Sequence, residues 1–233
     1  MQGYELIQPR RVLGVQPWGP SAFVMRFERR GLRFRAGTHV DVGLPGGLTR
    51  PYSLFSGEQD EIAEILVRLV PGGAVSSRLA RLKEGDLVLV KPPRGGFTLR
   101  HREQKDRLVL VATGTGIAPF RSFVRTVPEL PYLLVHGVRS LDEDFGADFE
   151  ANQERVLCLS SAEGRQPVAT EKFSKHCRIV PGRVTQWLDQ AELHIDRDRF
   201  YLCGNSAMLR EATEILARRG VPLERIHREN SAT

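Results

Sequence analysis

One short segment near the middle of the first half of the chain combines residue types that suit redox chemistry. Arg50-Pro51-Tyr52-Ser53 places a fixed cation, an aromatic ring and a hydroxyl beside one another. A flavin can use all three, because the ring can lie against its face, the hydroxyl can bond its reactive edge, and the guanidinium can pair with phosphate. On these residues alone, Tyr52 can equally be a core aromatic residue and Arg50 a surface cation.

A second segment, residues 111–120, reads Val-Ala-Thr-Gly-Thr-Gly-Ile-Ala-Pro-Phe. An apolar strand is expected before Gly114 and Gly116 and a helix after them, so bare backbone N–H groups and a helix N-terminus would face a dinucleotide phosphate. Pro119 would fall in the first helical turn, where its missing N–H costs nothing. The predicted loop is completed by Thr113, Thr115 and Ala118.

Two further turns contain candidate ligand-binding residues. Gly73 permits close backbone approach and Ser76 adds a hydroxyl at an expected helix start, where an anion can bind. The alternative is a hairpin turn in which Ser76 is a helix N-cap. Cys203, followed by Gly204, is expected at the carboxyl end of a parallel strand, where its thiol can contact a nicotinamide. The alternative there is a small buried hydrophobic residue.

The elements that must position these residues fall into two patterns. Up to about residue 100, short apolar runs alternate with Gly and Pro turns, which predicts an antiparallel β-barrel. The expected strands contain residues 23–27, 39–42, 65–70 and 87–90, and a short helix is expected at 76–82.

After residue 105, apolar strands alternate with helices, which predicts a parallel sheet covered on both faces. Strands are expected at 108–112, 132–136, 156–160 and 200–203, and helices at 117–126, 184–188 and 207–219. The polar stretch 101–105 is the natural boundary. We therefore expect two domains, 1–102 and 103–233.

Composition narrows the class of protein. The 233 residues carry a net charge of +6, but the basic residues are scattered and form no nucleic-acid motif. An acidic protein partner would explain the charge, as would a solvated surface without any partner. No apolar run is long enough to span a membrane, and no signal peptide is expected. Three cysteines without a Cys-x-x-Cys pair argue against a disulfide or an iron–sulfur cluster and favour the cytoplasm, and no metal site is expected.

In this order and spacing, the four segments resemble the ferredoxin–NADP reductase superfamily of flavoproteins over nearly the whole chain. The resemblance implies a flavin-binding barrel followed by an NAD(P)-binding α/β domain. It implies flavin contacts from the R-x-Y-S segment at 50–53 and from a G-x-x-S loop, and pyrophosphate contacts from residues 113–119. The G-x-x-S loop would contribute Gly73, Val75 and Ser76. Cys203 and Gly204 would lie near the nicotinamide, with Ser53, Cys203 and Glu229 as the catalytic residues.

Two departures from the family pattern bear on specificity and on access to the flavin. Where NADP-specific members carry Ser-Arg-Glu, this chain reads Ser161-Ala162-Glu163. Arg139 and Arg165 are the cations that we expect to contact the cofactor in that region, whereas Glu163 would favour NAD by accepting from ribose hydroxyls, so both dinucleotides stay open. The chain also ends without the aromatic residue that many members stack on the flavin.

The resemblance implies a cytoplasmic NAD(P)H oxidoreductase that passes hydride to FAD and then single electrons to a ferredoxin, a flavodoxin or an oxygenase component. Residues 36–54 also resemble the phthalate dioxygenase reductase branch, which uses FMN, but the stretch 73–82 favours FAD. The acceptor would be a separate, acidic protein. The alternatives are a flavin-containing relay subunit of a larger complex and a plain NAD(P)-binding module.

Overall fold

The computed structural model describes residues 7–99, 106–147, 149, 153–162 and 176–230. The chain divides into two compact units. The first is built from Met1–Thr98 and Ala118–Thr126, and the second from Leu99–Ile117 and Val127–Ser231. Each unit contains one six-stranded sheet.

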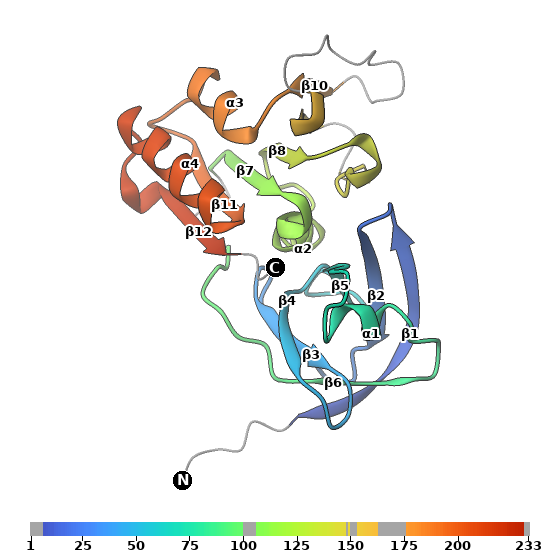
Figure 1. Ribbon diagram of the computed structural model, residues 1–233. Helices are drawn as coiled ribbons and strands as arrows, with labels where there is room; N and C mark the ends of the chain where they lie inside the picture. The colour runs from blue at the N-terminus through green and yellow to red at the C-terminus, as the bar shows by residue number, and fades with distance from the viewer. Residues whose placement is uncertain (1–6, 100–105, 148, 150–152, 163–175, 231–233) are drawn as a thin grey trace. The chain divides into compact units, whose positions relative to one another are not determined.

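The sheet of the first unit is antiparallel throughout, in the order β4-β3-β6-β1-β2-β5. A bridge between Leu54 and Ile65 joins its two ends, next to β4 and within β5. The predicted antiparallel barrel is therefore confirmed (Figure 1). Its strands are β1 (Gln8–Trp18), β2 (Ala22–Glu28), β3 (His39–Gly43), β4 (Thr49–Ser53), β5 (Ile62–Arg68) and β6 (Leu87–Val90).

Two helices belong to this unit. Helix α1 (Ser76–Leu79) is shorter than the predicted 76–82, and the chain after it continues in single turns, with the Leu82 N–H on the Leu79 carbonyl. Helix α2 (Ala118–Thr126) packs on the barrel residues after β4. The Ser122 hydroxyl donates to the Ser56 carbonyl at 2.7 Å, and Arg125 pairs with Glu64 at 2.7 Å.

The sheet of the second unit is parallel throughout, in the order β10-β9-β8-β7-β11-β12, as the alternation of strands and helices predicted. The edge strands β10 and β12 were not predicted, because each has only five residues and β12 is mostly polar. The strands are β7 (Leu108–Thr113), β8 (Tyr132–Val138), β9 (Glu154–Leu159), β10 (Cys177–Pro181), β11 (Arg199–Gly204) and β12 (Ile226–Asn230).

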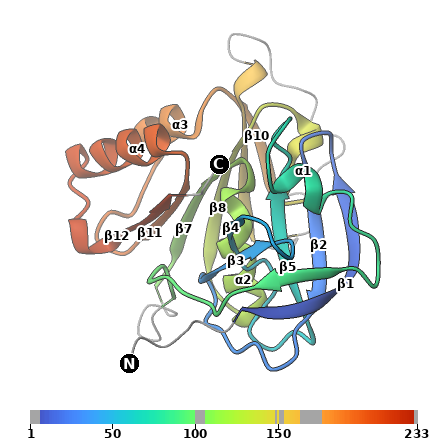
Figure 2. The ribbon, with the colours of Figure 1, turned by 60° about the horizontal axis from the view of Figure 1, so that its bottom comes forward.

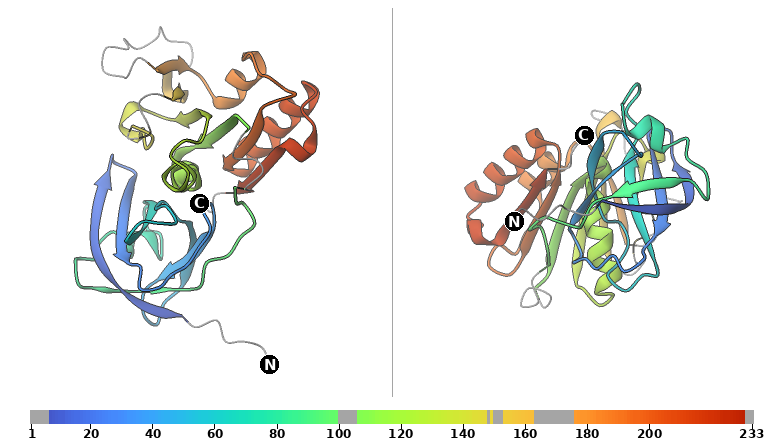
Figure 3. Two further views of the ribbon diagram at one scale, coloured as in Figure 1. Left: turned by 180° about the vertical axis from the view of Figure 1, so that it is seen from behind. Right: turned by 90° about the horizontal axis from the view of Figure 1, so that it is seen from below.

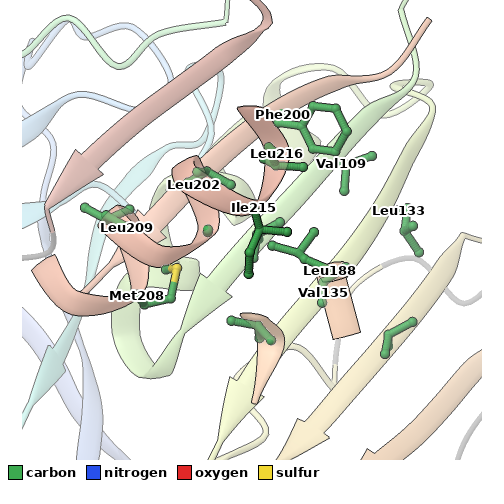
Figure 4. Close-up of a cluster of buried hydrophobic side chains, with 14 of the residues drawn as sticks. Val109, Leu133, Val135, Leu188, Phe200, Leu202, Met208, Leu209, Ile215 and Leu216 are labelled. Atoms are coloured by element: carbon green, nitrogen blue, oxygen red, sulfur yellow. The ribbon is translucent and has the colours of Figure 1, made fainter. Parts of the chain in front are cut away.

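The apolar core of this unit lies against one face of the parallel sheet. Helices α3 (Val184–Gln190) and α4 (Ser206–Arg218) lie side by side on it, as Figures 2 and 3 show. The facing side chains, among them Val109, Val135 and Leu202, pack against Leu188 and Ile215 of the helices (Figure 4). This packing is the ordinary apolar contribution to the stability of an α/β unit.

The opposite face of the same sheet carries several polar residues, which the apolar appearance of the strands did not indicate. Register partners share a face in a sheet. Ala112, on this face of β7, is paired with His136 of β8 on one side and with Cys203 of β11 on the other. Arg155 and Glu229 lie on the same face of β9 and β12. His136, Cys203 and Glu229 lie toward the carboxyl ends of their strands, whereas Arg155 lies near the amino end of β9.

Two general features remain. Among the residues that the structure describes, no helix is long and apolar enough to cross a membrane. Cys158, Cys177 and Cys203 are all buried free thiols.

Candidate functional site

The predicted flavin segment forms strand β4. Arg50 is exposed, whereas Pro51, Tyr52 and Ser53 are half-buried. The strand pairs only with β3 along its length, with Tyr52 opposite Val40 and Ser53 opposite His39. Arg50 and Tyr52 lie two residues apart and so share one side of the strand, while Ser53 lies on the other. The segment can therefore present a cation, a ring and a hydroxyl from one rigid element.

Tyr52 combines the two roles that its sequence context left open. Its ring packs against the apolar core of the barrel, yet the residue stays half-exposed. Burial raises the pKa of the phenol to about 12, against the opposing effect of the nearby Arg50 charge. The phenol is therefore neutral at physiological pH, which suits an aromatic surface for a planar ring.

The Gly73–Ser76 loop, in the same unit, is closely packed around Gly73. A Cβ at Gly73 would lie 2.8 Å from the Ser76 hydroxyl oxygen and 2.9 Å from the Val70 carbonyl oxygen. The Ser76 hydroxyl accepts the Val70 N–H at 3.1 Å and makes no capping bond, so the interpretation of Ser76 as an N-cap was wrong. Val75 has its side chain in the barrel core, which leaves only its backbone for a ligand.

The predicted nucleotide loop begins where β7 ends. Thr113 is the last residue of the strand, and Gly114–Ile117 forms a 3-10 turn that leads into α2. The order of strand, glycine-rich turn and helix is as predicted, with α2 beginning at Ala118, one residue after the expected start. Thr113, Gly114 and Thr115 are half-exposed, whereas Ala118 and Pro119 are buried in the first turn of α2.

The loop lies directly against the Cys203-Gly204 turn at the end of β11. A Cβ at Gly116 would meet the Cys203 carbonyl oxygen at 2.4 Å, and a Cβ at Gly204 would meet the Thr113 hydroxyl oxygen at 2.2 Å. Only glycine permits both approaches. The structure thus brings together two motifs that are far apart in the sequence, at the carboxyl edge of adjacent parallel strands, where such sheets bind ligands.

Glu229 joins the same edge from β12. It is the register partner of Cys203, and it is half-buried. Burial raises the pKa of the fully buried Cys203 thiol well above its usual range, and the negative charge of Glu229 raises it further. Cys203 is therefore a neutral thiol and not a nucleophilic thiolate.

Two of the residues predicted near the adenosine end of a dinucleotide lie together. Arg139 and Ser161 are both exposed, just after β8 and β9. The Ser161 hydroxyl and N–H both donate to the Arg139 carbonyl. Arg165 and Glu163 lie outside the described residues. The backbone of Arg139 is thus fixed by Ser161, and its side chain is exposed to solvent.

Three polar residues of this unit that lie close to one another escaped the sequence-based prediction: His136, Asp144 and Arg155. His136 is fully buried and its Nε2 lies 2.9 Å from the Gly114 carbonyl oxygen. Asp144 lies beneath it, in a bidentate pair with Arg155. A single histidine at the end of the apolar strand Tyr132–Val138 was the one available signal.

The pKa of Asp144 shows that this buried group is charged. Burial alone would raise the pKa, but the nearby His136 imidazole and the charge and hydrogen bonds of Arg155 outweigh it, so the pKa lies below its usual range. Arg155 also lies 3.3 Å from the Cys177 thiol. The two parallel hydrogen bonds between the Asp144 carboxylate and the Arg155 guanidinium fix the relative orientation of these two side chains.

The described residues fit the two cofactors that the motifs imply. A Cβ at Gly116, Gly204 or Gly73 would collide with neighbouring protein atoms, so glycine is required there for the loops to pack closely. The half-exposed residues Thr113, Gly114 and Thr115 lie between a strand and a helix, where backbone N–H groups can meet a phosphate. The half-exposed Tyr52 offers a neutral aromatic surface in the barrel. These are the features that a dinucleotide and a flavin, respectively, require.

Comparison with known proteins gives a consistent result. Residues 21–99 match the family model of the oxidoreductase FAD-binding domain, and residues 110–214 match that of the oxidoreductase NAD-binding domain. The chain thus carries an FAD-binding and an NAD-binding domain in the predicted order.

Individual relatives extend the match to most of the chain. A ferredoxin–NADP reductase of Pseudomonas aeruginosa is 34% identical, over 88% of this chain and 87% of its own length. The toluate 1,2-dioxygenase electron transfer component of Pseudomonas putida is 32% identical, over 82% of this chain and 56% of that protein. The crystal structure of a Neisseria gonorrhoeae ferredoxin NADP+ reductase with bound FAD and NADP shares the fold, with a TM-score of 0.82 at 23% identity, covering 96% of this chain and 98% of that one.

Proposed function

The chain belongs to the ferredoxin–NADP reductase superfamily, and on that premise we propose that it is an FAD-dependent NAD(P)H reductase that delivers electrons to a ferredoxin, a flavodoxin or an oxygenase component. Bound FAD supplies the chemistry, because it accepts a hydride and can release electrons one at a time. The observation that carries the proposal is the contact between the Gly116 loop and the Cys203-Gly204 turn. The protein's own task is to place and orient the cofactors.

The dinucleotide would be held at the carboxyl edge of β7 and β11. Backbone N–H groups of the turn at Gly114–Ile117 would face its pyrophosphate, with the Thr113 and Thr115 side chains beside them. The Cys203 thiol would contact the nicotinamide as a neutral, polarisable group, since its raised pKa keeps it protonated. Glu229, beside it, would accept a hydrogen bond from the nicotinamide amide.

The flavin would be held by the barrel. Arg50 would pair with its phosphate, with Gly73, the Val75 backbone and Ser76 completing the phosphate contacts. The Ser76 hydroxyl accepts from Val70 and so can still donate its own hydrogen. Tyr52 would lie against the ring system, and Ser53 would donate to its reactive edge. We assign the flavin-binding role to residues 1–102 and the nucleotide-binding role to residues 103–233.

The choice between NADPH and NADH would rest on exposed cations. Arg139, held by Ser161, offers one guanidinium for a 2′-phosphate, and Arg165 follows in the sequence. Ala162 provides no charge where NADP-specific members carry arginine. We therefore expect Ala162→Arg to shift the preference toward NADPH, since a charge-assisted contact is worth about 1.5–3 kcal/mol.

The partner would be a small acidic electron carrier. The net charge of +6 favours association with such a protein through electrostatic steering. Relatives named as ferredoxin–NADP reductase and as a dioxygenase electron transfer component support the two partner classes. We place the reaction in the cytoplasm, where free thiols persist.

Anaerobic stopped-flow absorbance tests the proposal. The purified protein, reconstituted with FAD, is mixed separately with NADPH and NADH, and the flavin bands are followed. Rapid bleaching by either dinucleotide supports the reductase, and the faster one identifies the substrate. A protein that cannot take up flavin would refute it. A flavin-containing protein that neither dinucleotide bleaches would favour the relay subunit instead.

A further inference from the structure

The nucleotide loop rests on a buried histidine whose role no motif identifies. His136 is the register partner of Ala112, and its Nε2 lies 2.9 Å from the Gly114 carbonyl oxygen. A carbonyl can only accept, so Nε2 carries the hydrogen and donates it. The fully buried imidazole thereby fixes the first peptide group of the loop.

This bond also determines where the next N–H points. The peptide group is planar and trans, so its carbonyl and its N–H point in opposite directions. Because the Gly114 carbonyl faces inward to His136, the Thr115 N–H of the same peptide group faces away from it. An anion at the loop meets that N–H without any reorientation of the backbone, which is the condition for preorganised binding.

Neighbouring side chains pack around the His136 imidazole. Its Nδ1 lies 3.9 Å from Asp144 Oδ1, which is beyond hydrogen-bond distance, so the carboxylate borders the ring without bonding to it. Both carboxylate oxygens of Asp144 accept from Arg155 at 2.9 Å, which fixes the carboxylate in that place. Asp144 also accepts the Gly146 N–H at 3.1 Å, and the His136 ring lies against Phe145. These contacts leave the imidazole little freedom to rotate away from the loop.

We propose that His136 is a positioning residue for the dinucleotide pyrophosphate, acting through the Gly114 carbonyl, with its ring packed beside Phe145 and the Asp144 carboxylate. The inference rests on the proposed function, because it assumes that the loop binds a pyrophosphate. It predicts a loss of dinucleotide affinity when the Nε2 donor is removed, while the hydride-transfer step at saturation changes little.

The test compares variants that differ in this donor. His136→Leu removes it at similar volume. His136→Gln can place an amide N–H where Nε2 lies, whereas the shorter His136→Asn cannot. Leu134→Ala is the matched control, because Leu134 is buried on the same face of β8 but has no hydrogen-bonding atom. If His136→Leu does not fold, the pair His136→Gln and His136→Asn still decides the question.

Two readouts separate positioning from simple destabilisation. Calorimetric titration measures binding of NADP+ (or NAD+, if NADH is the substrate) and of adenosine 2′-phosphate (or adenosine), which lacks the pyrophosphate. Stopped-flow flavin reduction gives the limiting rate. For His136→Leu and His136→Asn we expect about tenfold weaker dinucleotide binding, corresponding to about 1.4 kcal/mol, with the fragment and the limiting rate within about threefold.

The outcomes are distinct. His136→Gln should recover dinucleotide affinity to within about threefold of the wild type. Unchanged dinucleotide affinity in His136→Leu, or the same loss in Leu134→Ala, would overturn the inference. Equal losses for the dinucleotide and the fragment would also overturn it, since they indicate general disruption. A wild-type protein that neither binds nor oxidises a dinucleotide would instead refute the proposed function.

Discussion

Cys203 and Glu229 are register partners on the adjacent parallel strands β11 and β12, so a buried thiol and a carboxylate face the same side of the sheet at its carboxyl edge. The pairing adds to the effect of burial, and together they keep the Cys203 thiol protonated. Burial is the first cause of its raised pKa and the Glu229 charge the second, and both act in the same direction. A thiol in this setting is a contact group, not a nucleophile.

The protonated state of Cys203 is testable through its reactivity. In the native protein at pH 8, we expect Cys203 to resist alkylation by iodoacetamide, because the thiolate is the reactive form. Peptide mapping after short exposure measures this, with urea-unfolded protein as the positive control. Fast native alkylation of Cys203 would show that the thiol is ionised or accessible.

The same raised pKa predicts a loss of stability at alkaline pH. Above the usual thiol range the unfolded chain has lost a proton that the native state keeps, so the free energy of unfolding falls as pH rises. Cys203→Ser, whose hydroxyl does not titrate there, should show a smaller fall between about pH 8 and pH 10. Urea denaturation at each pH measures the difference, and equal slopes for the two proteins would contradict it.

Gly116→Ala should impair the nucleotide site without affecting flavin binding. The added Cβ would lie 2.4 Å from the Cys203 carbonyl oxygen and 2.8 Å from its carbon, and backbone atoms there cannot move without shifting the loop. We expect a destabilisation of about 1–3 kcal/mol and at least tenfold weaker NAD(P)H binding. Stopped-flow titration measures the affinity.

Gly14→Ala is the control for that variant. A Cβ at Gly14 meets nothing within 4 Å, so its binding and stability should stay close to those of the wild type. Wild-type NAD(P)H affinity in Gly116→Ala would mean that the loop does not contact the dinucleotide.

Tyr52 should matter for flavin retention through its ring and not through its hydroxyl. Tyr52→Phe keeps the aromatic face, and we expect it to retain FAD like the wild type. Tyr52→Ala removes that face and should weaken FAD binding by on the order of tenfold or more, since an aromatic contact contributes about 0.5–1.5 kcal/mol beyond its buried area. The flavin-to-protein absorbance ratio after gel filtration measures retention.

The control for Tyr52 is Leu44→Ala, because Leu44 packs against the same barrel core but lies outside the flavin segment. It should lower stability and leave the flavin content unchanged at low temperature. Equal flavin loss in Leu44→Ala and Tyr52→Ala would assign Tyr52 a packing role alone.

Asp144→Asn should lower stability at neutral pH and change its acid dependence. The variant leaves Arg155 buried without its counter-charge, which costs about 3–5 kcal/mol. Because the native pKa of Asp144 is lowered, the wild type has this contribution above about pH 4 and loses it as pH falls toward the native pKa. Urea midpoints between pH 7 and pH 3 should therefore fall more steeply for the wild type, and parallel curves would contradict the assignment.

Some features were predictable because they are local. Four of the barrel strands and the alternation of strands and helices follow from apolar runs and from Gly and Pro turns, and the structure confirms them, whereas β1 and β4 were not among the expected strands. The helix at Ser76 was predicted too long, and the alternative of a Ser76 N-cap was wrong, because the bond of its hydroxyl to Val70 depends on how the loop folds back. The turn at Gly114 was expected but its 3-10 form was not, since glycines specify permissive backbone and not one particular turn.

The sequence by itself determined the two domain types, the order of the flavin and dinucleotide motifs, and the positions of the glycine-rich turns, because periodicity and turn chemistry act over a few residues. Only the tertiary structure decided which distant residues meet. Strand register placed Cys203 beside Glu229. It also placed His136 within hydrogen-bond distance of the Gly114 carbonyl, with the Asp144–Arg155 pair next to the imidazole. Register is set by packing between strands and helices across the whole unit, so no local pattern could have specified these contacts.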